Sequence, residues 1–546
     1  MCELTKIRKK GRSKKRQELS FEELKAIVDR AKSAPLTDED HQKLKAAVDT
    51  LGALTLEIEA KGASVKRLRK LIFGAPTEKT SKVVGKTSSQ ENKSETTKTP
   101  AAKKKKRKGH GRNSAKDYEG ANKVDVPHES FKHGDPCSEC SKGKVYRQTK
   151  PAVLVRVTGL APLMATVYEK ERLRCGLCGK IFTAQSPDGV GDKKYDEKVG
   201  SMIAMLKYGC GLPFNRIEKL QANMKIPLPA GTQWGLVQEA SVLLLPLYQE
   251  LIRQAAQGTV LHNDDTTIKI LEIEREILQE LENDPDGRTG MFTTGIVATE
   301  SGREIALFFT GRNHAGENLE EVLSKRDSEL GPPIQMCDSL SRNTTGDFET
   351  IVANCMTHAR RKFVEVADNF PEECEHVLTE LAKVYKNDAV SKRKEMAPEE
   401  RLRFHKENSG PVMKKLKQWL QGQLDEKLIE PNSGLGDAIG FSLKHWDKLT
   451  LFLMVPGAPI DNNICERVLK KAILHRKNAL FFKTENGAHV GDLFMSFIHT
   501  CELNGVDPFD YLTEVQRHAD VAEKNPTDWM PWNYRQTLRI LNEESG

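Results

Sequence analysis

The feature that most restricts the fold of this chain is the order of strand-like and helix-like segments after Gly258. Three strand-like segments come first, and the second and third form a hairpin that turns at residues 300–303. A helix, a fourth strand and a short helix follow. In chain order the segments are Thr259–Leu271, Met291–Thr299, Glu304–Phe309, Ala315–Lys325, Ile334–Asp338 and Thr345–Ile351. The order β-β-β-α-β-α predicts an α/β core in this part of the chain.

Acidic residues interrupt two of these strands where the sequence is otherwise apolar. Asp264 lies in the polar run His262–Thr266 of the first strand, and Asp338 ends the fourth. An unpaired carboxylate in such a strand is costly unless a cation or hydrogen bonds compensate. With acids at these two places, the order is the one expected of a ribonuclease-H-like nucleotidyltransferase core.

A third acid completes a candidate metal site. Glu466 lies on a later helix, Ile464–Leu474, which continues with Lys470, Lys471, Arg476 and Lys477, a face suited to phosphate. Phosphodiester transfer uses two divalent cations, and Mg²⁺ prefers carboxylate ligands. We therefore take Asp264, Asp338 and Glu466 as candidate catalytic residues and ligands of two Mg²⁺ or Mn²⁺ ions. Spacing alone does not select them among 77 acidic residues, and the alternative for Glu466 is an i,i+4 ion pair with Lys470.

The length of 546 residues predicts several domains. Residues 357–453 are mostly helical and charged and look like an insertion, and the chain closes with helices at Ile464–Leu474 and Leu493–Leu503. No apolar run is long enough for a membrane helix, and the basic residues 1–15 precede no apolar segment, so we expect a cytoplasmic, nucleoid-associated protein.

Charge is distributed unevenly along the chain. The first 116 residues contain 31 Lys and Arg against 14 Asp and Glu, a net charge of +17, whereas the whole chain carries +8. Most of the excess lies in a linker that should stay disordered until it meets phosphate, and its candidate DNA contacts are Lys103, Lys104, Lys105, Lys106, Arg107, Lys108 and Arg112. The alternative is a solvated tail that only aids solubility.

Four of the 11 cysteines form two closely spaced pairs, Cys137–Cys140 and Cys175–Cys178. Two residues between cysteines, with glycines beside each pair, are typical of the knuckles that bind tetrahedral zinc. We predict a zinc ribbon that holds one structural Zn²⁺, with strands near Val153–Val157 and Thr166–Glu169. Four thiolate ligands would close the site, so this zinc would stabilise the fold without taking part in catalysis.

Two further segments have helical patterns. Residues 21–74 contain an apolar repeat starting at Leu44, which favours a short coiled coil, although packing against the rest of the protein explains it equally well. Helices from Phe214 to Met224 and from Thr232 onward are arranged like a helix-turn-helix. Two ordinary packed helices are the alternative.

Several longer motifs resemble bacterial transposases of the insertion sequence 66 family. The similarity covers roughly residues 40–515 and is most specific from Leu261 onward. The matching segments are Leu68–Gly74, Gly109–Arg112, the paired cysteines, Gly211–Pro213, Cys355–Phe363, Asp461–Arg467, Arg476–Phe481 and Glu502–Leu512.

The resemblance implies a DDE transposase with a ribonuclease-H-like core and an α-helical insertion before its third acid. Asp264 matches the first acid and Asp265 takes the place of its usual glutamate neighbour. Asp338 matches the second acid, with Ser339–Arg342 where the family has Gly-Tyr, and Glu466 matches the third. The resemblance also implies that Arg467, Arg476 and Lys477 position DNA, and the phosphate-binding face of the same helix adds Lys470. It further implies residues that support the site, namely Asp265, His358, Arg360, Arg361 and Asn462. Core packing is the alternative for His358.

Together these features predict a multidomain α+β protein that binds double-stranded DNA at terminal inverted repeats and joins 3′-hydroxyl ends to target DNA. We expect a homodimer or larger synaptic assembly, with accessory proteins of the same element as further partners. The rivals are a ribonuclease-H-like nuclease without strand transfer, an inactive zinc-containing DNA-binding regulator and an RNA-binding adaptor. The expected divisions are 1–75 (helical), 76–125 (linker), 126–190 (zinc ribbon), 191–256 (helix-turn-helix-like), 257–356 and 456–515 (core), 357–455 (insertion) and 516–546 (tail).

Overall fold

The computed structural model separates the chain into two compact units, residues 1–89 and 90–546. The structure describes residues 21–31, 35, 37–45, 132–136, 138, 142–146, 162–174, 181–188, 193–280, 288–300 and 302–544. In the first unit, helix α1 (Phe21–Arg30) is joined to the helical residues 38–45 by an ion pair between Arg30 and Asp40, 3.0 Å apart. Beyond Lys45, the predicted coiled-coil repeat lies outside the described residues.

In the second unit, β1 (Arg172–Arg174) and β2 (Ile181–Thr183) form a small antiparallel sheet. Residues 166–169, where a strand was expected, have no regular structure, and the strand forms slightly later in the chain. Cys137, Cys140, Cys175 and Cys178 all lie outside the described residues, so the zinc ribbon stays a prediction.

A mixed five-stranded sheet forms the centre of the second unit. Its strands are β3 (Val260–Thr267), β4 (Phe292–Glu300), β5 (Arg303–Gly311), β6 (Ile334–Cys337) and β7 (Ile351–Asn354). The spatial order is β5-β4-β3-β6-β7: β3, β4 and β5 pair antiparallel, whereas β3, β6 and β7 are parallel. The expected hairpin is confirmed by the β4–β5 pairing.

Two expectations about this region are wrong. The predicted helix near Thr345–Ile351 is absent, and residues 351–354 instead form strand β7, because a short run with two β-branched residues pairs along the whole of β6. An unexpected helix, α7 (Leu271–Glu280), follows the first strand directly and buries Ile273 and Ile277. The observed order is therefore β-α-β-β-α-β-β.

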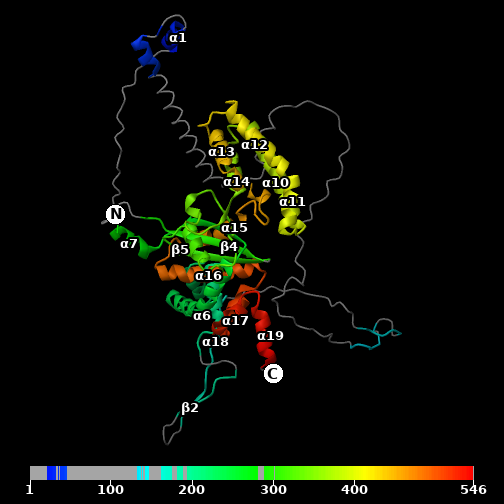
Figure 1. Ribbon diagram of the computed structural model, residues 1–546. Coiled ribbons are helices and arrows are strands. Elements are labelled where there is room, and N and C mark those ends of the chain that lie inside the picture. Colours follow the sequence, from blue (N-terminus) through cyan, green and yellow to red (C-terminus); the bar gives the residue numbers. More distant parts are fainter. Residues whose placement is uncertain are drawn as a thin grey trace. The chain divides into compact units, whose positions relative to one another are not determined.

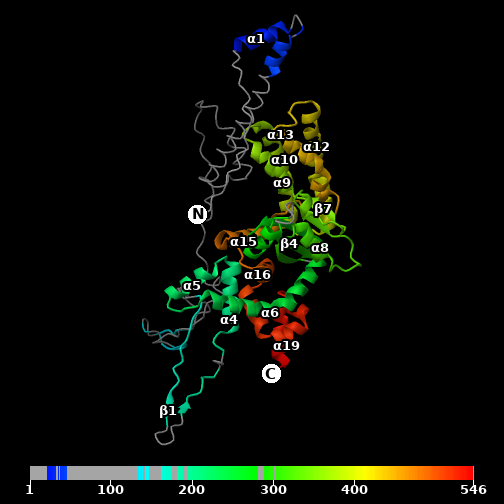
Figure 2. The same ribbon diagram turned by 90° about the vertical axis from the view of Figure 1, so that its left-hand side faces the viewer.

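Helices surround this sheet in the second unit (Figures 1 and 2). Those before and within the sheet region are α4 (Glu197–Ala204), the π-helix η3 (Met205–Gly209), α5 (Phe214–Asn223), α6 (Ala230–Ala256), α8 (Ala315–Leu323) and the 3₁₀ turn η4 (Ser341–Asn343). Helices α5 and α6 confirm the two helices expected after residue 213. Figure 2 shows them beside α4, and both α4 and α5 contact α6.

The segment predicted to be a helical insertion is helical. It comprises α9 (Met356–Val366), α10 (Pro371–Arg393), α11 (Pro398–Asn408), α12 (Gly410–Asp425), α13 (Gly434–Lys444), α14 (Trp446–Leu449) and η5 (Leu451–Leu453). Helices α10 to α13 lie together in Figure 1, and α14 contacts β7. The insertion therefore adjoins the edge strand β7.

The chain returns to the sheet with α15 (Asn463–Ala479), α16 (Glu485–Leu503), α17 (Pro508–Arg517), α18 (Ala519–Lys524), η6 (Pro526–Trp529) and α19 (Tyr534–Glu544). The region expected to be a tail is folded, since Trp529, Met530 and Tyr534 are buried in the main core. Among the described residues, none of the helices has the length and apolar character needed to cross a membrane.

The sheet is covered on both faces. Asn318 of α8 donates a hydrogen bond to Thr294 Oγ1 (2.8 Å), and Cys465 Sγ of α15 donates one to the Gly295 carbonyl (3.2 Å). Successive side chains of a strand point to opposite faces, so α8 and α15 pack on opposite sides of β4. A Cβ on Gly295 would lie 3.0 Å from Leu469, which explains why α15 packs here over a glycine.

Helix α16 covers the other edge of the sheet, at β5. The backbone N–H groups of Ala306, Phe308 and Thr310 point away from β4 and donate to Thr500 Oγ1, Ser496 Oγ and Asp492 Oδ2, at 3.0, 3.0 and 2.7 Å. Residues spaced by four on the helix thus meet residues spaced by two on the strand. Asn504 extends the ladder, because its Nδ2 donates to the Glu304 carbonyl at 2.7 Å. The helix satisfies an edge that would otherwise invite pairing with another chain.

Candidate active site

The sheet topology brings the first two candidate acids together. Strands β3 and β6 pair in parallel with His262 opposite Met336, and continuing this register by two residues places Asp264 level with Asp338. The Asn343 side chain lies between them: its Nδ2 donates to Asp338 Oδ1 at 2.6 Å and to Asp264 Oδ1 at 3.3 Å. The two carboxylates therefore share one hydrogen-bond donor.

Asn343 is held in place by buried polar side chains of β3 and β6. Its carbonyl oxygen accepts hydrogen bonds from Asn263 Nδ2 and Gln335 Nε2, both at 2.7 Å. Asn263, Gln335 and Asn343 are all 0% exposed. The sequence reasoning missed Asn343. The available signal was that Asn263 and Gln335 sit in buried strands, where a polar side chain needs a partner.

The electrostatics of the pair suit a divalent cation. Burial, followed by repulsion from Asp338, raises the pKa of Asp264 to about 7. The charges of Asp265 and Glu466 act in the same direction, whereas a hydrogen bond from the Asp265 backbone opposes them. A cation beside such carboxylates would stabilise their charged forms. The residues present therefore fit the metal that the acid pattern predicts.

Asp265, the neighbour of the first acid, has a different environment. Its side chain is 2% exposed and lies 3.0 Å from His314 Nδ1 and 3.5 Å from the Arg342 guanidinium. These partners occupy both of its oxygens. Of the two adjacent aspartates, Asp264 is therefore the one that faces Asp338.

The position of Glu466 depends on the residue one turn earlier. Asn462 precedes α15, and its carbonyl accepts from the Glu466 N–H at 3.1 Å. Its side chain contacts β3 twice, through His262 Nδ1 and the Asn263 carbonyl (both 3.0 Å). Its N–H also donates to Cys355 Sγ at 3.2 Å. Asn462 thus joins the start of α15 to the first strand and to the start of α9.

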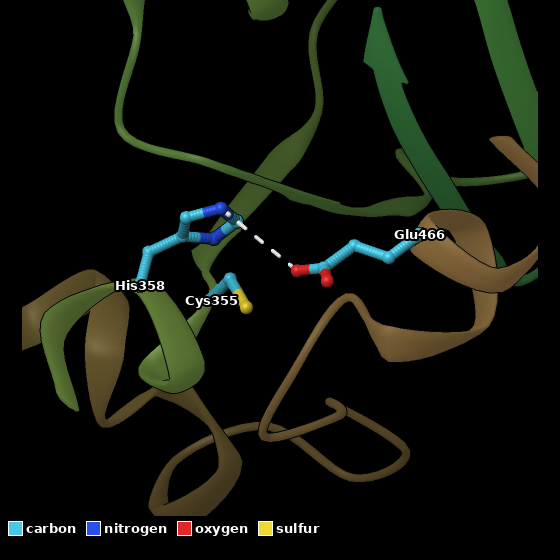
Figure 3. Close-up of side chains that lie close together, drawn as sticks. All are labelled: Cys355, His358 and Glu466. Carbon is cyan, nitrogen blue, oxygen red and sulfur yellow. Dashed lines mark ion pairs between the residues drawn. The ribbon is translucent and has the colours of Figure 1, made fainter. Parts of the chain in front are cut away.

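The Glu466 carboxylate lies in a second cluster, beside the acid pair. Its Oε1 is 3.8 Å from His358 Nε2 and its Oε2 is 3.9 Å from the Arg361 guanidinium. Figure 3 shows Glu466 pointing toward His358 and Cys355, and one ligand atom from each of these three residues lies within 4.8 Å of the other two. Among the described residues, Asp264, Asp338 and Glu466 do not form a group of that tightness. The structure therefore brings two of the three acids together and places the third nearby.

Cys355 is a further residue that the sequence reasoning did not single out. It is 1% exposed, and burial raises the pKa of its thiol to about 11, against the opposing effect of backbone N–H groups of Asn462, His358 and Thr357. A signal was present, because Cys355 and His358 are three residues apart at the start of a helix and so share one face.

The candidate DNA-positioning residues on α15 fall into two groups. Arg467, Lys470 and Lys477 are exposed. Arg476 is engaged, since its guanidinium donates to the Thr266 and Thr267 hydroxyl groups at 3.1 and 2.9 Å and to the Thr267 carbonyl. Arg476 therefore holds the end of β3 in place.

The remaining candidates lie elsewhere in the chain. Arg360 lies on α9, one turn before the buried Phe363. The linker residues Lys103–Lys108 and Arg112 lie outside the described residues.

Fold and site together define a mixed α/β protein with a carboxylate pair on adjacent parallel strands, Asp264 within β3 and Asp338 directly after β6. The chain belongs to the Transposase IS66 family, whose model matches residues 193–490. This match confirms the resemblance seen in the sequence.

Two proteins of Sinorhizobium fredii (strain NBRC 101917 / NGR234) are similar to this chain. The uncharacterized protein y4jD is 26% identical over 421 residues, which cover 72% of this chain and 78% of the relative. The uncharacterized protein y4hP is 24% identical over 385 residues, 67% of each chain. The similarity thus extends beyond the sheet and its insertion.

Proposed function

We propose that this protein is a DDE transposase that binds the terminal inverted repeats of an insertion sequence, cleaves the element's ends and joins their 3′-hydroxyl groups to target DNA. Membership of the transposase family supports the class of reaction. The strand order β5-β4-β3-β6-β7, with parallel pairing only around β6, supports a ribonuclease-H-like catalytic core. The transfer would proceed by direct in-line attack, without a covalent enzyme intermediate.

The observation that carries the proposal is the pairing of Asp264 and Asp338. Their strands are hydrogen-bonded neighbours, and one Asn343 amide contacts both carboxylates. Asp264 and Asp338 are both only partly exposed, and two like charges so close together are costly unless a positive charge balances them. Their placement at the same level of β3 and β6 is therefore better explained by cation binding than by stability.

Asp264, Asp338 and Glu466 would hold two Mg²⁺ or Mn²⁺ ions, which would activate the attacking oxygen and stabilise the leaving oxygen. Asn343 would orient the two aspartates through its shared amide. Asn462 would position the first turn of α15, from which Glu466 reaches the site. His358 and Arg361 lie beside Glu466 and would support its orientation. Asp265, which pairs with Arg342, would support the position of its neighbour Asp264.

DNA would be bound by several parts of the chain. Exposed Arg467, Lys470 and Lys477 on α15 lie on the helix that carries the third acid. Helices α5 and α6 would act as the helix-turn-helix, and the basic linker and the zinc ribbon of Cys137, Cys140, Cys175 and Cys178 would add contacts. Phosphate contacts would supply most of the affinity and its salt dependence. Two element ends would be paired in a dimer or larger assembly. The sequence-based domain divisions remain part of this proposal, except that the region expected to be a tail belongs to the main core.

A strand-transfer assay with a precleaved element end tests the proposal. The wild-type protein should join the end to target DNA in the presence of Mg²⁺, and Asp338→Asn should abolish joining. Asp347→Asn is a matched control, because Asp347 is an exposed acid in the same loop.

The same assay separates the rivals. A nuclease would cut an intact end but never join a precleaved one. Full joining by Asp338→Asn would contradict the catalytic assignment, and DNA binding without either reaction in the wild-type protein would favour an inactive regulator.

A further inference from the structure

We propose that Cys355, His358 and Glu466 form a separate binding site for a thiophilic divalent cation such as Zn²⁺, and that a cation bound there withdraws Glu466 from the acid pair. The first half concerns the cluster alone. The second half rests on the proposed function, because it requires that the acid pair needs Glu466 for catalysis.

The cluster offers three different metal ligands from two helix starts. Cys355 immediately precedes α9, His358 lies in the first turn of α9, and Glu466 lies in the first turn of α15 (Figure 3). Zinc binds cysteine sulfur, histidine nitrogen and carboxylate oxygen at about 2.0–2.3 Å, so its ligand atoms lie about 3.3–3.8 Å apart. The observed separations within 4.8 Å require only small side-chain movements to enclose one ion.

Two buried atoms of the cluster have no hydrogen-bond partner in the described part of the chain, Glu466 Oε1 and His358 Nδ1. A buried polar atom without a partner is costly, and an ion is one of its ordinary explanations. Oε1 is the oxygen that faces His358 Nε2, whereas Oε2 faces Arg361. The unsatisfied oxygen of Glu466 is therefore the one directed into the cluster.

Backbone N–H groups around the sulfur partly offset the cost of burying the thiolate that zinc requires. The Asn462 N–H points at Cys355 Sγ from 3.2 Å, and backbone N–H groups of Thr357 and His358 approach it from the first turn of α9. These groups and the positive end of the helix stabilise negative charge on sulfur. Cation binding would replace the S–H bond by a metal–sulfur bond and release the proton to solvent.

Ligand chemistry separates this site from the acid pair. Carboxylate oxygens suit Mg²⁺ and Mn²⁺, whereas thiolate and imidazole select zinc-like ions. Glu466 is the one residue that both sites would use. Zinc bound by Cys355 and His358 would hold the Glu466 carboxylate in the cluster and would therefore compete with its use in catalysis.

Metal binding by the full-length protein tests the first half. The protein is loaded with one equivalent of Zn²⁺ for the predicted ribbon, freed of excess metal and titrated with Co²⁺, whose thiolate charge-transfer absorption reports cysteine ligation. Cys355→Ser and His358→Gln should each bind about one equivalent less than the wild-type protein and lose part of this absorption. Cys374→Ser is the control, because Cys374 is equally buried on α10 outside the cluster.

Circular dichroism selects the variants that fold, and two different ligand substitutions make the result independent of either one. Equal Co²⁺ binding by the wild-type protein and both folded variants would overturn the site. The comparison needs no DNA and no activity, so it stands even if the proposed transposition chemistry fails.

Zinc inhibition of strand transfer at fixed Mg²⁺ tests the second half. Each protein is compared with its own activity without added zinc. The zinc concentration that halves activity should be at least tenfold higher for Cys355→Ser than for the wild-type protein and Cys374→Ser. Cys355-dependent binding with equal inhibition of all three proteins would overturn the sharing of Glu466, whereas absence of joining by every protein would instead count against the proposed function.

Discussion

The ladder between α16 and β5 makes a specific prediction about Asp492. This side chain is 3% exposed, and its two oxygens accept hydrogen bonds from the Thr310 N–H (2.7 Å) and hydroxyl (2.6 Å). Burial nevertheless raises its pKa to about 7, and the Thr310 hydrogen bonds only partly oppose that shift. We predict that Asp492→Asn increases the free energy of unfolding at pH 8.

The sign follows from proton binding. The folded protein holds the Asp492 proton up to about pH 7, whereas the unfolded chain releases it near pH 3.8. The folded state therefore binds more protons in this window, and wild-type stability falls as pH rises through it. Full ionisation of the buried carboxyl costs about 4 kcal/mol, at 1.36 kcal/mol per pKa unit.

An asparagine removes this cost and keeps most of the contacts. Its oxygen can accept from the Thr310 N–H, and its amide can donate to Thr310 Oγ1, which lies 2.9 Å from Thr293 Oγ1 and can donate there in turn. Allowing about 1 kcal/mol for a weakened hydrogen bond leaves a predicted gain of about 3 kcal/mol at pH 8. The same reasoning gives a gain below about 1 kcal/mol at pH 5, where most of the wild-type carboxyl is still protonated.

Urea unfolding followed by tryptophan fluorescence measures the effect. All five tryptophans lie between residues 234 and 532, within the unit that contains the sheet. Ser496→Ala is the matched control, because it removes the neighbouring contact to β5 without removing a titrating group. A difference between Asp492→Asn and the wild-type protein that does not grow from pH 5 to pH 8, or a loss of stability at pH 8, would refute the reasoning.

Three further predictions concern the site. Asn343→Ala should lower strand transfer about 10- to 100-fold at unchanged DNA affinity, because it removes the amide shared by the two aspartates; unchanged strand transfer would contradict that role. Gly316→Ala should lower the free energy of unfolding by about 1–3 kcal/mol in urea, since its Cβ would lie 2.1 Å from the Thr344 carbonyl oxygen, and a neutral effect would show that the loop yields easily. Lys477→Gln should reduce the salt dependence of DNA binding by about one phosphate contact. Arg476→Gln should chiefly lower the free energy of unfolding, because it releases β3. Equal effects of the two variants on the salt dependence would refute the assignment of Lys477 to DNA and Arg476 to the fold.

Much of the sheet could be predicted from local pattern. The hairpin of β4 and β5 is encoded by two apolar runs on either side of a short turn, and the acids of β3 and β6 stand out against apolar neighbours. Strand β7 could not be recognised in this way, because its four residues are stabilised mainly by pairing with β6. The packing of α16 along β5 could not be predicted from the sequence either. Asp492, Ser496 and Thr500 look like ordinary polar residues of a helix until their partners on the strand are known.

The candidate site could likewise be predicted from the sequence only in part. Asp264 and Asp338 could be placed together because parallel strands end at a common edge. Asn343 could not, because its role depends on a loop that folds back over buried Asn263 and Gln335. The side-chain direction of Glu466 was equally inaccessible, since sequence spacing locates a helix but does not select among the rotamers of its residues.

This difference has a physical consequence for the three acids. Asp264 lies within β3 and Asp338 directly follows its neighbour β6, and both side chains are short, so their separation cannot change much without disturbing the sheet. Glu466 is longer and lies in the first turn of a helix whose start is fastened to β3 and to Cys355 through Asn462. Its backbone is therefore fixed while its carboxylate can rotate among side-chain rotamers. In the proposed site, a rigid pair with one adjustable acid would allow cation binding to be completed or left incomplete by a single side-chain rotation, and Glu466 is the acid whose carboxylate lies beside His358 and Arg361.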